Sequence, residues 1–259
     1  MDVSIVLPCF NEARRLPDRL PEALAYFRAH MTESFELLFV DDGSTDETAA
    51  VLRRVQAQHP DIPIVIERYP SNRGKGYAVR YGVLRSRGGK ILVMDADFSI
   101  SLAEMEKCLA QLDRYDIVVG SKKHGQTQTV KHQRLIRRWL GKSYTVFINY
   151  MLGLAFTDIT CGLKGFRGAV ARDLFRRQRI ERWGYDAETL FLARQLHYRT
   201  AEVPVRWHHI EGSKVFPLVD VLRSAYDLGL ILLTYWSGGY HLEHKEPQAP
   251  ATSEAVARE

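Results

Sequence analysis

The chain has 259 residues, of which 46% are hydrophobic and 26% charged, and its formal net charge is +5. This composition is ordinary for a soluble globular protein with one large domain or two small ones. No apolar run reaches the roughly 18–20 residues that span a bilayer, and the N-terminus does not resemble a signal peptide. The cysteines Cys9, Cys108 and Cys161 form no CxxC pair or Cys/His cluster, which disfavours a cysteine metal site and indicates reduced thiols.

The first half of the chain alternates between strand and helix patterns. Apolar, β-branched runs separated by amphipathic segments indicate an α/β fold with a mostly parallel sheet covered on both faces. Strands are expected at residues 3–8, 35–44, 62–69, 90–97 and 116–121, and helices at 15–31, 44–59, 75–88 and 102–115.

The pattern changes after residue 120. The segment 117–157 contains no acidic residue; its first part is rich in lysine and arginine and its second part is apolar and aromatic. Further on, helices are expected at 171–178 and 186–197, a strand at 199–210 and a terminal helix at 217–236. Residues 238–259 have the composition of a disordered tail.

Acidic and polar groups follow three of the expected strands, at residues 8–12, 40–46 and 94–99. Parallel sheets bind ligands at the carboxyl ends of their strands, so these groups predict one site. On extended chain Asp95 and Asp97 would point the same way, roughly 7 Å apart, and their repulsion would be relieved by a divalent cation holding a diphosphate. Neither GxxxxGK[ST] nor GxGxxG is present, which disfavours ATP hydrolysis and dinucleotide redox chemistry.

Several of these segments carry a family resemblance. "IVLPCFNEARRL", "LLFVDDGSTDET", "NRGKGYAVRYGV" and "VMDADFS" resemble the GT-A glycosyltransferases of family 2. "DITCGLKGFRG", "ERWGYDAETLFLA" and "AEVPVRWHHIEGSKV" are similar to its dolichyl-phosphate β-glucosyltransferase branch. The resemblance covers about residues 3–237 and implies a Rossmann-like GT-A sheet flanked by helices, followed by C-terminal amphipathic helices at a membrane interface.

The resemblance also implies a donor site with Mg²⁺ or Mn²⁺. Asp97 would be the more direct metal ligand, Asp95 would lie close to metal and sugar, and Ser99 stands where some relatives carry glutamine. The other implied donor-binding residues are Pro8, Phe10, Glu12, Asp42, Gly74 and Lys75.

An acceptor region is implied in the same way. The residues implied for an acceptor phosphate are Lys122, Arg134, Ser213 and Lys214. Trp183 and Glu188 match the sugar and acceptor region, although Trp183 could instead fill the core and Glu188 could be a surface charge. Asp186 is the candidate general base if the acceptor is a neutral hydroxyl. Cys161 is expected to be a packed residue rather than a nucleophile.

The activity implied is inverting transfer of glucose from UDP-glucose to a polyprenyl phosphate of the dolichyl type, giving a β-linked product. An acceptor phosphate is anionic near neutral pH, so it needs cations to hold it beside the donor rather than a strong base. The alternatives are another donor (GDP-mannose, UDP-GlcNAc or a UDP-uronic acid), a non-lipid acceptor, or a non-catalytic nucleotide-sugar or membrane-binding module.

The basic and aromatic segment 117–157 predicts contact with an anionic membrane surface. A basic helix at the core edge and a nucleic-acid patch are alternatives, but no base-reading motif is present, so no nucleic-acid partner is expected. The expected location is cytoplasmic, peripheral on the cytoplasmic face of a membrane. The expected division is a donor half at 1–120, an acceptor half at 121–215, a terminal amphipathic helix at 216–237 and the tail at 238–259.

Overall fold

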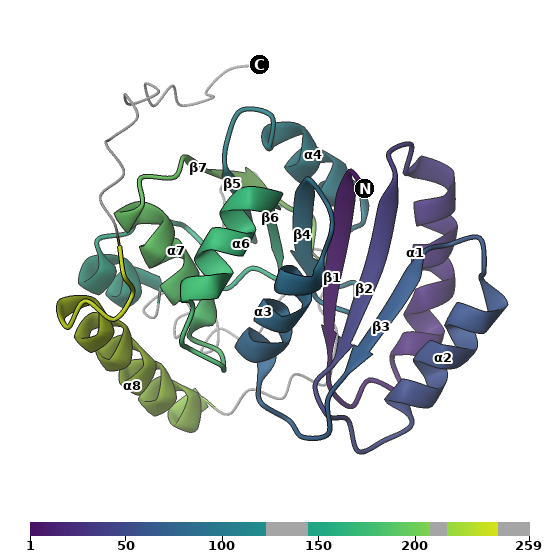
Figure 1. Cartoon of the computed structure of the whole chain (residues 1–259), viewed down its shortest axis with the longest axis horizontal. Coiled ribbons are helices and arrows are strands. Elements are labelled where there is room, and N and C mark those ends of the chain that lie inside the picture. Colours follow the sequence, from purple (N-terminus) through teal and green to yellow (C-terminus); the bar gives the residue numbers. More distant parts are fainter. Residues whose placement is uncertain (123–144, 208–216, 243–259) are drawn as a thin grey trace.

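The computed structural model describes residues 1–122, 145–207 and 217–242, and it shows a central sheet flanked by helices (Figure 1). The strands are β1 (Val3–Cys9), β2 (Phe35–Asp41), β3 (Ile64–Arg68), β4 (Lys90–Met94), β5 (Ile117–Ser121), β6 (Leu163–Arg167) and β7 (Thr200–Pro204). The helices are α1 (Leu16–His30), α2 (Thr48–Gln58), α3 (Lys75–Arg85), α4 (Ala103–Gln111), α6 (Gly168–Arg177), α7 (Tyr185–Gln195) and α8 (Pro217–Trp236), together with an unlabelled helix at residues 145–152.

Within the described residues, the sheet has seven strands in the order β3-β2-β1-β4-β6-β5-β7. The pairs β1–β2, β1–β4, β2–β3 and β5–β7 are parallel, whereas β6 runs antiparallel to its neighbours β4 and β5. The prediction of a mostly parallel α/β sheet is confirmed.

A layer of buried side chains lies on each face of the sheet. Helices α1, α2 and α4 cover one face, and α3, α6 and α7 cover the other, where α8 adds Leu228 and Ile231. The strands in the middle of the sheet are buried almost throughout, as expected for a sheet covered on both sides.

Strand β6 is absent from the sequence expectations. It contains Lys164 and Gly165, which are poor strand formers. Gly165 is required by close packing, because a Cβ there would lie 2.6 Å from the Cys108 Sγ of α4 and 3.1 Å from Leu92. The glycine that allows β6 to pack in the sheet is therefore also a residue that makes the strand hard to predict from the sequence.

Two further expectations need correction. Strand β4 ends at Met94, so Asp95 and Asp97 lie on a turn beyond the strand, in which the Phe98 amide donates to the Asp95 carbonyl. The chain also remains folded beyond α8 as far as residue 242, and Tyr240 is only 2% exposed. The prediction of disorder is therefore wrong for residues 238–242; residues 243–259 lie outside the described residues.

Candidate functional site

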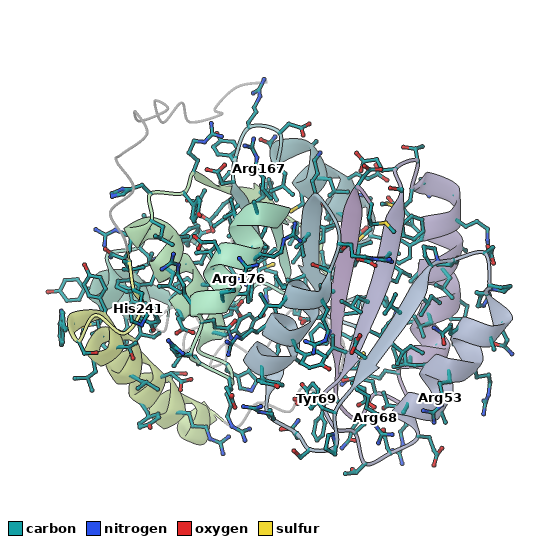
Figure 2. All side chains as sticks on the ribbon, in the orientation of Figure 1. Arg53, Arg68, Tyr69, Arg167, Arg176 and His241 are labelled. Atoms are coloured by element: carbon teal, nitrogen blue, oxygen red, sulfur yellow. The ribbon has the colours of Figure 1, made fainter. Side chains whose placement is uncertain are left out.

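The loops after β1 and β2 are joined at the carboxyl edge of the sheet. The Asn11 and Glu12 amides donate to Ser44 Oγ (2.9 Å) and Thr48 Oγ1 (2.8 Å), and the Thr45 amide donates to Asn11 Oδ1 (2.9 Å). The predicted acidic segments do share one edge, and Pro8, Phe10 and Glu12 lie half-buried along it. In Figure 2, Arg68 and Tyr69 mark this edge and Arg167 marks the opposite one.

Asp42, at the end of β2, organises the loop that leads into α3. Its buried carboxylate accepts hydrogen bonds from the Tyr69 hydroxyl (2.8 Å), the Asn72 amide group (2.7 Å) and the backbone amides of Arg73 (2.7 Å) and Gly74 (2.9 Å). Burial raises the pKa of Asp42, although these donors oppose the shift. Asp42 thus holds the loop that ends at Gly74; its contact with a nucleoside stays a prediction.

Lys75 and Asp95 form the central ion pair of the site. Lys75 Nζ lies 2.5 Å from Asp95 Oδ1, and a Cβ at Gly162 would lie 2.1 Å from Asp95 Oδ2, so this glycine leaves room for the carboxylate. Burial alone would raise the pKa of Asp95, but Lys75, Lys122 and Lys164 lower it below its usual value. For Lys75, burial alone would lower the pKa of the ammonium group, but the neighbouring carboxylates of Asp95 and Asp186 raise it above its usual value.

The other two members of the predicted metal set lie just beyond this pair. The Asp97 carboxylate accepts a hydrogen bond from the Ser99 amide (2.9 Å). Asp97 is half-buried and Ser99 is buried. Asp95 and Asp97 lie on the same turn after β4, and the Ser99 backbone amide holds the Asp97 carboxylate.

A second, deeper ion pair was not foreseen from the sequence. Lys164 Nζ on β6 lies 2.6 Å from Asp186 Oδ1 at the start of α7, and the two side chains are only 3% and 6% exposed. Lys164 also donates to the Cys161 carbonyl (2.7 Å). The sequence did contain a signal for this pair, because Lys164 stands among apolar and glycine residues in "CGLKGF". A lysine that is buried in such a segment needs a partner of opposite charge.

Lys122 also has a partner that was not foreseen. Its backbone amide donates to Asp158 Oδ2 (3.1 Å), and its Nζ lies 3.9 Å from the same oxygen. Burial would lower the pKa of Lys122, but Asp158 and Asp95 raise it. Asp158 is fully buried and its amide donates to Glu202 of β7, so a chain of contacts positions Lys122 beside the site.

The remaining predicted residues have different outcomes. Trp183 is 55% exposed, with Lys75 Nζ 5.4 Å from its ring centroid, so it is not a core residue. Glu188 is fully buried, so it is not a surface charge, and Cys161 is buried as expected. Arg134, Ser213 and Lys214 lie outside the described residues.

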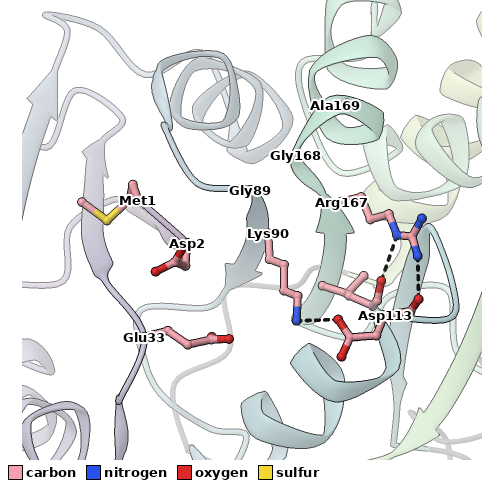
Figure 3. Close-up of a pocket in the computed structure, with 10 residues that line it drawn as sticks. Met1, Asp2, Glu33, Gly89, Lys90, Asp113, Arg167, Gly168 and Ala169 are labelled. Atoms are coloured by element: carbon pink, nitrogen blue, oxygen red, sulfur yellow. Dashed lines mark hydrogen bonds and ion pairs between the residues drawn. The ribbon is translucent and has the colours of Figure 1, made fainter.

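A separate pocket of about 530 Å³ lies at the opposite edge of the sheet (Figure 3). Its lysine and arginine are engaged: Lys90 pairs with Asp113 (2.8 Å), and Arg167 donates to the Leu112 and Asp113 carbonyls. The residues that line it include none of the predicted site residues. The candidate site is therefore the lysine–carboxylate cluster at the carboxyl edge, defined by Lys75, Asp95, Asp97, Lys122, Lys164 and Asp186.

Solved structures share this architecture. Mannosyl-3-phosphoglycerate synthase from Rubrobacter xylanophilus superposes with a TM-score of 0.64 at 17% identity, covering 98% of this chain and 80% of that one. Glucosyl-3-phosphoglycerate synthase from Mycobacterium tuberculosis, solved with Mn²⁺, UDP-glucose and glycerol 3-phosphate, gives a TM-score of 0.59 at 15% identity, covering 90% and 79%. The fold is GT-A-like, as the resemblance implied.

Sequence comparison identifies the family. A dolichyl-phosphate beta-glucosyltransferase from Mus musculus is 34% identical over 93% of this chain and 78% of its own length, and the one from Homo sapiens is 32% identical over the same shares. The family model described as glycosyl transferase family 2 matches residues 4–175. The chain belongs to glycosyl transferase family 2.

Proposed function

We propose that this protein transfers glucose from UDP-glucose to a polyprenyl phosphate with inversion at the anomeric carbon. Relatives that match over nearly the whole chain are named dolichyl-phosphate beta-glucosyltransferases, which supports this choice of donor sugar and acceptor. The structural observation that carries the proposal is the lysine–carboxylate cluster. Its carboxylates suit a cation bound to a diphosphate, Lys75 suits the diphosphate itself, and Lys122 suits a second phosphate.

Asp95 and Asp97 would hold the metal ion, with Ser99 as a further candidate ligand. Among the described residues no group of three or more His, Cys, Asp or Glu side chains could hold a metal ion. Two carboxylates completed by diphosphate oxygens are a donor set that Mg²⁺ and Mn²⁺ commonly accept, so the residues present fit this ion. When bound, the metal would act as a Lewis acid for the departing nucleoside diphosphate.

Lys75 would change partners when the donor binds. In the structure its ammonium neutralises Asp95 at 2.5 Å. A donor diphosphate would offer Lys75 another anionic partner and leave the Asp95 oxygens for the metal. Asp42 supports this exchange indirectly, because it holds the Gly74 amide next to Lys75. Pro8, Phe10, Glu12 and Asp42 would line the nucleoside end.

The state of Asp186 favours a phosphate acceptor over a neutral hydroxyl. A hydroxyl acceptor would need a general base, but Asp186 is held in a buried ion pair with Lys164. A phosphate monoester requires no such base, only cations that hold it for in-line attack. Lys122 would supply one of them; Arg134, Ser213 and Lys214 remain predictions of the sequence.

The helix at 145–152 and α8 would rest on a membrane surface. Their outward-facing apolar residues are at least 37% exposed: Val146, Phe147, Tyr150 and Met151 on the first, and Tyr226, Leu230, Leu233 and Trp236 on the second. Both helices pack against the end of α7, where Arg194 donates to the Leu152 carbonyl and Gln195 accepts from Tyr235. In the described part of the chain, no helix has the length and hydropathy needed to span a bilayer. A neighbouring pair of exposed apolar faces is suited to the interface.

A product assay tests the proposed function. Purified protein is incubated with Mg²⁺, a polyprenyl phosphate and, in separate reactions, UDP-glucose, GDP-mannose, UDP-GlcNAc and UDP-glucuronic acid. Mass spectrometry of the lipid fraction should detect hexosyl polyprenyl phosphate with UDP-glucose. Products from another donor alone, or from hydroxyl acceptors alone, would replace the proposal with one of the alternatives. Absence of turnover alongside nucleotide-sugar binding would indicate a binding module.

A further inference from the structure

The loop at residues 178–184, between α6 and α7, lies directly on the first turn of α3. The Tyr77 amide donates to the Glu181 carbonyl (2.8 Å), and the Gln178 side chain donates to the Gly76 carbonyl (3.0 Å). A Cβ at Gly76 would lie 2.7 Å from the Ile180 carbonyl oxygen. Because Lys75 sits on this turn, a displacement of the loop would move the lysine that pairs with Asp95.

The buried Glu188 carboxylate fixes one end of this loop. It accepts hydrogen bonds from the backbone amides of Arg179 (2.8 Å) and Ile180 (2.9 Å) and from the Tyr240 hydroxyl (2.7 Å). Glu188 is fully buried, and Tyr240, which follows α8, is 2% exposed. All three donors bind a carboxylate that is fully buried, so Glu188 is in no position to contact a substrate.

Helix α8 fixes the other end. The Gly184 amide donates to Asp227 Oδ2 (3.1 Å). The two residues are in close contact, because a Cβ at Gly184 would lie 2.6 Å from Asp227 Oδ2 and 2.7 Å from Asp227 Cβ. The backbone of Gly184 is helical, with φ −69° and ψ −7°, so α8 rather than backbone strain prevents a larger residue there.

We propose that α8 and the turn that follows it form a positioning element for the donor site. Asp227 and Tyr240, the second acting through Glu188, hold the 178–184 loop at both ends. In this way they fix the position of Trp183 directly, and they fix the position of Lys75 through the contacts between the loop and α3. This inference rests on the proposed function, since Trp183 and Lys75 act on a nucleotide sugar only if that function holds. It links the helix with the exposed apolar face to the chemistry at the sheet edge.

Two variants test the two attachment points in the full-length protein. Tyr240→Phe removes only the hydroxyl that donates to Glu188, and Gly184→Ala places a methyl group against Asp227. The matched control is Tyr26→Phe, which removes a tyrosine–glutamate hydrogen bond between α1 and α4, on the other face of the sheet. The readouts are amide hydrogen exchange at residues 179–184, thermal unfolding, and KM and kcat for UDP-glucose.

Tyr240→Phe is expected to speed exchange of the Arg179 and Ile180 amides, and Gly184→Ala that of the amide at residue 184. Each increase should be about tenfold, the effect of losing roughly one hydrogen bond to a charged group. Both variants should also lower kcat/KM for UDP-glucose several-fold, while Tyr26→Phe changes neither quantity. Faster exchange with unchanged kinetics would reduce the contacts to a structural role and overturn the proposal, as would unchanged exchange.

The exchange measurement needs no turnover, so it separates this inference from the proposed function. If the wild-type protein makes no glycolipid, the proposed function fails on the product assay. Affinity for UDP by calorimetry then replaces KM as the functional readout. Unchanged UDP affinity in both variants, despite faster loop exchange, would overturn the positioning role in that case.

Discussion

Lys164 and Asp186 illustrate what single residues contribute to this site. A buried ion pair costs desolvation energy and is seldom needed for stability alone. Here the pair connects β6 to the start of α7 and leaves Asp186 neutralised beside the Lys75–Asp95 pair. The same pairing explains why we favour an anionic acceptor.

Lys164→Met should destabilise the protein by about 3–5 kcal/mol, because it leaves the Asp186 charge buried without its partner. The double variant Lys164→Met/Asp186→Leu should recover much of this loss, since neither charge then remains. Urea unfolding measures both free energies. Equal stability of the single variant and the wild type would show that the pair is not buried as described.

Glu188 makes a second residue-scale prediction, on pH. Burial raises the pKa of this carboxyl above its unfolded value of 4.5, against the opposing effect of its three hydrogen-bond donors. A raised pKa means that the folded state holds the proton more tightly. The contribution of Glu188 to stability is therefore largest below pH 4.5 and is lost as the pH rises through the folded pKa.

The unfolding free energy of the wild type minus that of Glu188→Gln should accordingly fall as the pH is raised above about 4.5. Urea titrations at several pH values between about 4 and 8 would measure it. A difference that grows with pH would mean that the donors from Arg179, Ile180 and Tyr240 outweigh burial. The variant's own lost hydrogen bond shifts the difference by a constant and leaves this slope unchanged.

At the scale of elements, sequence patterns predicted what depends on local periodicity and missed what depends on distant packing. The parallel strands, their covering helices and the limits of α8 follow from apolar spacing. Strand β6 does not, because Gly165 is dictated by Cys108 of α4. Tyr240 lies in a polar, glycine-containing stretch, and only its burial and its contact with Glu188 in the folded protein show that it belongs to the core. Asp158 and Lys164 were missed for a similar reason: their partners are distant in the sequence.

Helix α8 gives a prediction of its own at this scale. Leu233→Glu and Trp236→Glu place a negative charge on its exposed apolar face, where the native side chains are 63% and 71% exposed. Each should weaken sedimentation with anionic vesicles by about tenfold or more, through lost apolar contact and added repulsion. Ala57→Glu on α2 adds the same charge to an exposed helix position away from α8 and should have little effect. Vesicle binding unchanged in both α8 variants would remove α8 from the membrane surface.

At the scale of the whole molecule, both halves of the chain build one sheet and one cluster of charges. Lys75, Asp95 and Asp97 come from the first half, while Lys164 and Asp186 come from the second, because β6 inserts between β4 and β5. The sequence motifs predicted the carboxyl edge and the donor carboxylates. Lys75 and Lys122 were implied by the family resemblance, but Lys164 and the carboxylates that pair with all three lysines could be assigned only from the fold.

The most direct test of this account is the metal dependence of UDP binding, measured by calorimetry. With Mg²⁺ or Mn²⁺ present, the wild-type protein should bind UDP at least about a hundredfold more tightly than in chelator, a difference of roughly 2.7 kcal/mol. Asp97→Asn should lose most of this gain, and returning the metal should restore it only in the wild type. Equal UDP affinity with and without chelator, together with undiminished glycolipid synthesis, would contradict the assignment of Asp95 and Asp97 as the residues that hold the metal and diphosphate.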